Sequence, residues 1–208
     1  MARPLLALLA ILSFALAAPA LGQTAATGSE GWSFSAAAFA YFVPRDDDFV
    51  MPIVSADRGS LHLEARYNYE ELDTASVWGG WTFGGGTKLE WEITPIAGVV
   101  LGELDGVAVG YEGSLKWRAL ELYSESEYVF DTSGSEGSFF YNWSELTVAP
   151  AEWLRLGLVA QRARVYESDR EVNPGLLVGL SYASATATVY VLNPDDDATV
   201  IVSLGLEF

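Results

Sequence analysis

The stretch Thr199-Val-Ile-Val-Ser-Leu-Gly-Leu-Glu-Phe208 ends the chain with apolar side chains at every second position. Successive side chains of a strand point to opposite faces. One face therefore carries Val200, Val202, Leu204, Leu206 and Phe208. The other carries Thr199, Ile201, Ser203, Gly205 and Glu207. One apolar face and one small or polar face are typical of a strand that separates lipid from a wet interior.

This ending resembles the C-terminal signal of Gram-negative outer-membrane β-barrel proteins, which their assembly machinery recognises. Leu204, Leu206 and Phe208 carry the resemblance. It implies an integral, multi-pass barrel in the outer membrane of a Gram-negative bacterium. It also implies outer-membrane lipid and lipopolysaccharide as surroundings, and the barrel-assembly machinery as a partner during biogenesis.

The N-terminus has the pattern of a secretory signal peptide. Arg3 precedes an apolar run from Leu5 to Ala18, and Ala20-Leu-Gly22 supplies a small-x-small cleavage site. The run is shorter than the roughly twenty residues that a spanning helix needs. We therefore expect residues 1–22 to be removed, residues 23–31 to form a short N-terminal segment, and residues 32–208 to form the barrel. The chain has no Cys, which excludes disulfides and a lipid-modified cysteine.

Alternation of period two recurs along the whole chain and predicts an all-β, antiparallel, up-and-down transmembrane barrel. An even number of strands is expected when both termini face the periplasm. Twelve strands fit the pattern best, and ten is the alternative, because the segment near Pro52 and the turn near Ala183 give weaker signals. The expected strands are 32–43, 49–57, 60–70, 75–84, 88–102, 106–117, 119–130, 139–149, 153–166, 175–182, 186–192 and 198–208.

The connections between these segments alternate in character. The odd ones hold more than half of the 28 acidic residues, and the even ones are mostly shorter. Long loops on one side and tight turns on the other are typical of outer-membrane barrels, so we place the acidic loops outside the cell. Aromatic residues predict two girdles. The periplasmic one comprises Trp32, Phe83, Trp117, Trp153 and Phe208, and the outer one Tyr67, Tyr69, Tyr128, Phe130, Tyr141, Trp143 and Tyr166.

Charged residues alternate with the apolar ones and are expected to face inward, since a cation at the midplane of the lipid costs about 2–4 kcal/mol. They comprise His62, Glu64, Arg66, Glu90, Glu92, Glu112, Lys116, Glu121, Glu125, Glu127, Glu145, Arg155 and Glu207. Twelve strands lie between a filled eight-stranded barrel and an open sixteen-stranded porin. One interpretation is a narrow passive channel favouring small cationic or polar solutes. The alternative is a closed structural or surface-interaction barrel with a salt-bridged interior.

A third function class is an outer-membrane lipid hydrolase, because some of these enzymes are twelve-stranded and use a His near a Ser. His62 is the only histidine, and Ser60 lies two residues before it. Ser60 falls at a predicted turn and His62 faces inward, away from lipid. We therefore assign no catalytic residue and expect no enzyme. His62 is expected to pair with Glu64 or with a neighbouring strand.

Two acidic runs and two arginines complete the candidate sites. Asp46, Asp47 and Asp48 would lie beside Asp195, Asp196 and Asp197, because the last strand of a closed barrel pairs with the first. Their carboxylates could hold divalent cations. Arg162 and Arg164 point outward at the outer headgroup level, where lipid phosphate is a possible ligand. A net charge of −17 argues against nucleic-acid binding, and no motif indicates a cofactor.

Overall fold

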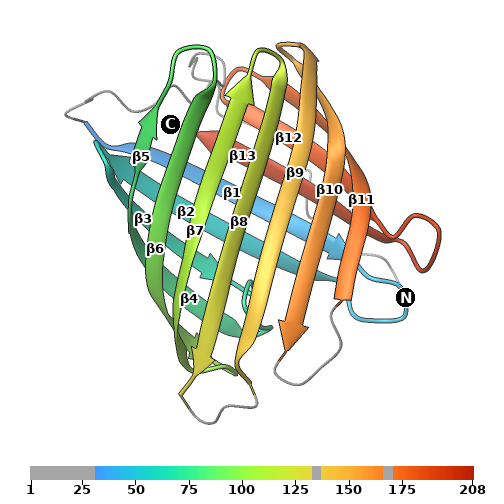
Figure 1. Ribbon diagram of the computed structural model, residues 1–208. Helices are drawn as coiled ribbons and strands as arrows, with labels where there is room; N and C mark the ends of the chain where they lie inside the picture. The colour runs from blue at the N-terminus through green and yellow to red at the C-terminus, as the bar shows by residue number, and fades with distance from the viewer. Residues whose placement is uncertain (1–30, 133–136, 166–170) are drawn as a thin grey trace.

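The computed structural model describes residues 31–132, 137–165 and 171–208, so the predicted signal peptide lies outside it. The described residues form strands joined by turns (Figure 1). The strands are β1 (Ser33–Phe42), β2 (Phe49–Arg58), β3 (Leu61–Tyr67), β4 (Thr74–Trp81), β5 (Phe83–Gly85), β6 (Glu90–Gly102), β7 (Gly106–Trp117), β8 (Leu120–Asp131), β9 (Phe139–Ala151), β10 (Leu154–Val165), β11 (Glu171–Tyr182), β12 (Ala185–Leu192) and β13 (Thr199–Glu207). Within these ranges no helix is long and apolar enough to cross a membrane.

The strands close into one antiparallel barrel. Every strand pairs with its neighbour in the chain except that β4 and β5 do not pair with each other; β4 pairs with β6, and β1 pairs with β13. The short β5 follows β4 after Thr82 and pairs with the same β6, so β4 and β5 act as one wall strand and the barrel has twelve. The predicted fold class is confirmed and the ten-stranded alternative is wrong. Pro52 pairs with Ala38 inside β2, and Ala183 makes the turn after β11 with a φ of 52°.

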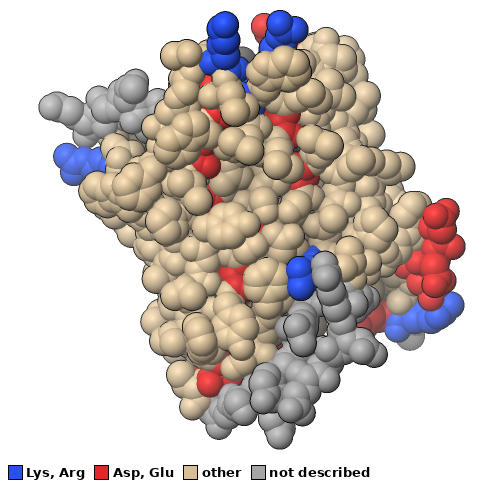
Figure 2. Space-filling model, in the orientation of Figure 1, with Lys and Arg blue, Asp and Glu red and all other residues tan. Residues whose placement is uncertain are grey.

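The two faces of the wall differ as the alternation predicts. Leu204 and Leu206 of β13, and Phe208 directly after it, have exposed side chains, whereas Ile201 and Ser203 are buried inside. Figure 2 shows an outer surface that is mostly uncharged, with basic residues gathered at the upper end and an acidic group at the β12–β13 loop. An uncharged exterior around a charged interior is the pattern that a lipid bilayer requires.

Exposed aromatic side chains mark the end of the barrel at which the chain terminates. Trp117 and Trp153 are exposed there, and Phe34 stacks on Phe208 with ring centroids 6.1 Å apart. The predicted outer girdle is only partly present: Tyr67 and Phe130 face outward, and Tyr166 lies outside the described residues. Three of its predicted members, Tyr69, Tyr141 and Trp143, pack into the interior instead.

Two apolar clusters fill part of the interior. The larger is built on Tyr41, Met51, Trp143, Val159, Leu177, Tyr190, Leu192 and Ile201. The smaller contains Trp78, Ile96, Val100, Ala108 and Val129. Trp78 lies flat over Gly98 of the paired strand, where a Cβ atom would lie 2.6 Å from the indole ring. The large ring is therefore accommodated because the residue opposite it has no side chain.

Candidate functional site: a charged lumen

The centre of the lumen is occupied by Arg66, whose side chain is only 2 % exposed. Its Nη1 donates to Glu127 Oε2 at 3.0 Å and its Nη2 to Glu112 Oε1 at 3.3 Å. Its Nε donates to Glu64 on the same strand. These partners come from β3, β7 and β8, so one guanidinium ties β3 to two strands with which it does not pair in the sheet. Its planar fork of donors suits several carboxylates at once.

Aromatic rings hold this guanidinium in place. The Arg66 Cζ lies 4.2 Å from the centre of the Tyr69 ring and 4.9 Å from that of Trp78. Both contacts are within cation–π range. Beside them, Tyr123 Oη donates to Glu125 Oε2 at 2.7 Å. Four acidic side chains of the lumen, those of Glu64, Glu112, Glu125 and Glu127, are thus each held by a specific donor.

A second charged group lies on β9 and β10. Arg155 Nη1 is 3.0 Å from Glu145 Oε2, and Trp143 Nε1 donates to Glu145 Oε1 at 2.9 Å. The Arg155 side chain is 31 % exposed, whereas that of Glu145 is 6 % exposed. This pair joins neighbouring strands, so it reinforces the wall and does not cross the lumen.

His62 also faces the lumen. Its Nδ1 lies 2.8 Å from Asp57 Oδ1 on the neighbouring strand β2. Its Nε2 is buried and has no hydrogen-bond partner within the described part of the chain. The predicted pairing with a neighbouring strand is therefore found, and the alternative pairing with Glu64 is not. An inward-facing imidazole is badly placed to attack lipid.

The remaining predicted lumen residues lie toward the end at which the chain terminates. Glu90 pairs in register with Lys116, and Lys116 with Glu121, on adjacent strands. Glu92 is half-buried on the same inward face of β6, and Glu207 occupies the inward face of β13. Charged side chains therefore line the lumen from Arg66 and its three glutamates to the end of the barrel at which the chain terminates.

Two further carboxylates of the lumen, Asp57 and Glu70, are not among the predicted inward-facing residues. Asp57 lies at the end of the expected strand 49–57 and shares the inward parity of Ile53 and Ser55, so the alternation could have identified it. Glu70 lies at the end of the expected strand 60–70, but β3 ends at Tyr67 and Glu70 belongs to the loop that follows. It is buried there and accepts bonds from Ser76 Oγ at 2.5 Å and Trp78 Nε1 at 3.2 Å.

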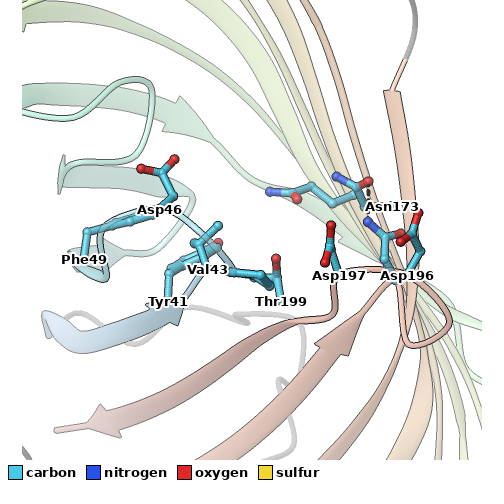
Figure 3. Close-up of a pocket in the computed structure, with 11 residues that line it drawn as sticks. Tyr41, Val43, Asp46, Phe49, Asn173, Asp196, Asp197 and Thr199 are labelled. Carbon is cyan, nitrogen blue, oxygen red and sulfur yellow. Dashed lines mark hydrogen bonds between the residues drawn. The ribbon is translucent and has the colours of Figure 1, made fainter.

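The opposite end opens into a pocket of about 510 Å³ (Figure 3). Asp46, Asp196 and Asp197 line it together with Tyr41 and Asn173. Of the loops that carry the two aspartate runs, one follows β1 and the other precedes its paired strand β13, and both contribute to this one pocket, with Asp46 across it from Asp196 and Asp197. They are joined by Arg45, whose Nη1 is 2.7 Å from Asp197 Oδ2.

The two aspartate runs do not bring three ligand atoms together. In the described ranges the only such group is elsewhere, in the lumen. Cation binding by Asp46, Asp47, Asp48, Asp195, Asp196 and Asp197 stays a prediction.

Arg162 extends from the outer face of β10. Its Cζ lies 5.2 Å from the centre of the Phe140 ring, and its buried Nε has no partner among the described residues. The side chain of Arg164 lies outside the described residues. Phosphate binding by this pair is not tested by the geometry and stays a prediction, as does recognition of Leu204, Leu206 and Phe208 by an assembly machinery.

No family model matches the chain, and no curated protein matches its sequence. Its fold is similar to that of solved barrels. The KdgM porin aligns with a TM-score of 0.64 and 10 % identity, over 84 % of this chain and 99 % of that one. KdgM in complex with disordered oligogalacturonate aligns with a TM-score of 0.65, 10 % identity and the same shares.

The Acinetobacter baumannii outer membrane protein Omp33 aligns less well, with a TM-score of 0.49, 10 % identity, and coverage of 85 % of this chain and 97 % of that one. The alignment with KdgM covers nearly all of that porin and most of this chain. The protein therefore has the closed twelve-stranded fold of an outer-membrane porin.

Proposed function

We propose that the protein is a narrow, passive outer-membrane channel that favours small cations. The observation that carries the proposal is the acid excess of the lumen: Glu64, Glu112 and Glu127 share the single guanidinium of Arg66. A ring of carboxylates in a pore favours cations and repels anions. The porin fold supports the channel class, and the lumen charges support the preference.

The outer mouth strengthens this preference. Asp46, Asp196 and Asp197 line its pocket, and Arg45 opposes them. A mouth lined mainly by one sign of charge concentrates counter-ions before they enter. Small cations are thus attracted at the mouth and met by further carboxylates inside.

The acidic lumen argues against oligogalacturonate, the ligand found in the KdgM porin, as a solute of this protein. KdgM was solved with oligogalacturonate, a polymer that carries a carboxylate on each sugar. A polyanion of this kind would be repelled by the carboxylates around Arg66. The solutes of this protein should therefore differ from that ligand in charge, although the two barrels share a fold.

The proposal includes a location. An uncharged outer face and exposed aromatic residues at the barrel ends suit a lipid bilayer. We place the protein in the outer membrane, surrounded by lipid and lipopolysaccharide and inserted there by the barrel-assembly machinery after removal of the signal peptide.

A closed structural barrel is the second candidate, and one observation favours it. The side chains of Arg66 and Glu127 are only 2 % and 3 % exposed, so little water reaches them. If Arg66 and its partners Glu64, Glu112 and Glu127 do not move, these four side chains close the lumen where they lie. If they move, the channel is narrow and its conductance is well below that of an open porin.

Planar-bilayer recording on the refolded protein distinguishes the two candidates. We expect small conductance steps, and a reversal potential in a KCl gradient that indicates preference for K⁺ over Cl⁻. Glu92→Gln, on the inward face of β6, should reduce that preference. Glu71→Gln, an exposed loop residue, serves as the control and should change it less.

The truncation Arg66→Ala supplies a second test. Because it removes a long side chain that projects into the lumen, it should enlarge the conductance. Correctly folded protein that conducts neither as the wild type nor as Arg66→Ala would establish the closed barrel. A preference for Cl⁻ would contradict the proposed selectivity.

A further inference from the structure

One group of side chains in the lumen adds a residue that the proposed channel does not use, His62, to two of the glutamates that it does use. A ring nitrogen of His62 and one carboxylate oxygen each of Glu64 and Glu112 lie within 4.8 Å of one another. His62 and Glu64 come from β3 and Glu112 from β7. The His62 side chain is only 9 % exposed. Imidazole nitrogen and carboxylate oxygen are ligands of divalent transition metals.

The hydrogen bonding of the His62 ring is a second, independent observation in favour of a metal site. His62 Nδ1 lies 2.8 Å from Asp57 Oδ1, whereas the buried Nε2 has no hydrogen-bond partner within the described residues. When Nδ1 carries the proton and donates it to Asp57, Nε2 presents a lone pair. A metal-binding histidine is typically held in this way, with a carboxylate on its other nitrogen.

The two glutamates can take part without losing Arg66. The bonds from Arg66 go to Oε1 of Glu64 and Oε1 of Glu112, which leaves Oε2 of each as a candidate ligand. Donor atoms lie about 2 Å from a bound Zn²⁺. Small rotations of the flexible Glu side chains would bring all three donors to a shared ion.

Charge favours the same conclusion. Glu64, Glu112 and Glu127 share one guanidinium, and Asp57 adds a further carboxylate beside His62. Carboxylates in excess that are largely withdrawn from water need a counter-charge. A divalent ion held by His62, Glu64 and Glu112 would supply it.

We propose that His62, Glu64 and Glu112 form a binding site for a divalent transition-metal ion of the Zn²⁺ class, with Asp57 as the residue that positions His62. The nitrogen ligand distinguishes it from a Ca²⁺ or Mg²⁺ site, which takes oxygen donors. The site goes beyond the proposed channel function and does not depend on it, because a closed lumen could bind the ion equally well.

The sole histidine of the chain makes the test direct. The detergent-solubilised protein, labelled with ¹⁵N in its imidazole, is titrated with Zn²⁺ at pH 8 in excess Ca²⁺, which occupies oxygen-only sites. We expect saturation at one Zn²⁺ per barrel. The Nε2 resonance should shift strongly, and Nδ1 should remain protonated. An unshifted Nε2 resonance at saturating Zn²⁺ overturns the proposal.

Calorimetric titration of variants with Zn²⁺ tests the other residues of the proposed metal site. His62→Ala should abolish the Ca²⁺-resistant binding, and Glu112→Gln should weaken it at least tenfold. Asp57→Asn should weaken it about 10- to 100-fold, the usual effect of losing such a partner. Glu145→Gln, a lumen carboxylate paired with Arg155 outside the group, is the matched control and should retain wild-type affinity.

Electrophoretic heat-modifiability confirms that each variant is folded before its affinity is read. Zn²⁺ binding that survives His62→Ala, or that falls equally in Glu145→Gln and Glu112→Gln, overturns the site. Neither measurement depends on conductance, so failure of the metal site and failure of the channel proposal remain separate results.

Discussion

Arg66 and Glu127 are joined by a 3.0 Å bond across the barrel, although 61 positions separate them in the chain. The bond connects β3 to β8, which do not pair in the sheet. Backbone hydrogen bonds hold only neighbouring strands together, so this contact constrains the barrel in a direction that the sheet does not.

Loss of Arg66 should destabilise the barrel. Arg66→Ala leaves Glu64, Glu112 and Glu127 without their shared cation, and breaking a buried pair in this way costs about 3–5 kcal/mol. Urea unfolding in lipid vesicles, followed by Trp fluorescence, measures the free energy of unfolding. Arg155→Ala is the control and should cost less, since Arg155 is 31 % exposed and has one acidic partner. Equal losses in the two variants would contradict the central role of Arg66.

Gly98 should not tolerate even one added methyl group. A Cβ atom there would lie 2.6 Å from Trp78 Cδ2, and overpacking of this kind costs about 1–3 kcal/mol. Gly98→Ala should lower the free energy of unfolding by that amount. Gly79→Ala, whose Cβ would lie 4.0 Å from Leu63 Cδ2 on the outer face, is the matched control and should be nearly neutral. The same unfolding assay compares the two.

The alternation of side chains predicted the barrel, its strand number and the inward face of Arg66, because the period of a strand is fixed by backbone geometry. It could not predict that Arg66 meets Glu127, since contacts across the lumen depend on how the sheet closes. The parity shared with Glu145 could have placed Trp143 inside. Tyr69 was not predictable in this way, because Asn68 adopts a φ of 57° and breaks the alternation.

The ion pair between Arg45 and Asp197 should matter more for selectivity than for stability. Its side chains are 81 % and 50 % exposed, and exposed pairs contribute less than about 1 kcal/mol. Arg45→Ala should leave the urea midpoint nearly unchanged. It should raise the preference for cations in bilayer recordings, and 1 M salt should remove most of that increase. A large drop in stability would contradict this interpretation.

Arg162 should contribute to the association of the barrel with lipopolysaccharide. Its guanidinium lies over Phe140 on the outer face of β10, and its terminal Nη nitrogens, rather than the buried Nε, are the donors that a lipid phosphate could accept from. Arg162→Ala should reduce the lipopolysaccharide retained by the purified protein. Arg58→Ala is the matched control, since Arg58 also lies over an aromatic ring, Trp32, but at the periplasmic end. Because lipopolysaccharide occupies the outer leaflet alone, equal retention by the two variants would show that Arg162 binds no lipid phosphate.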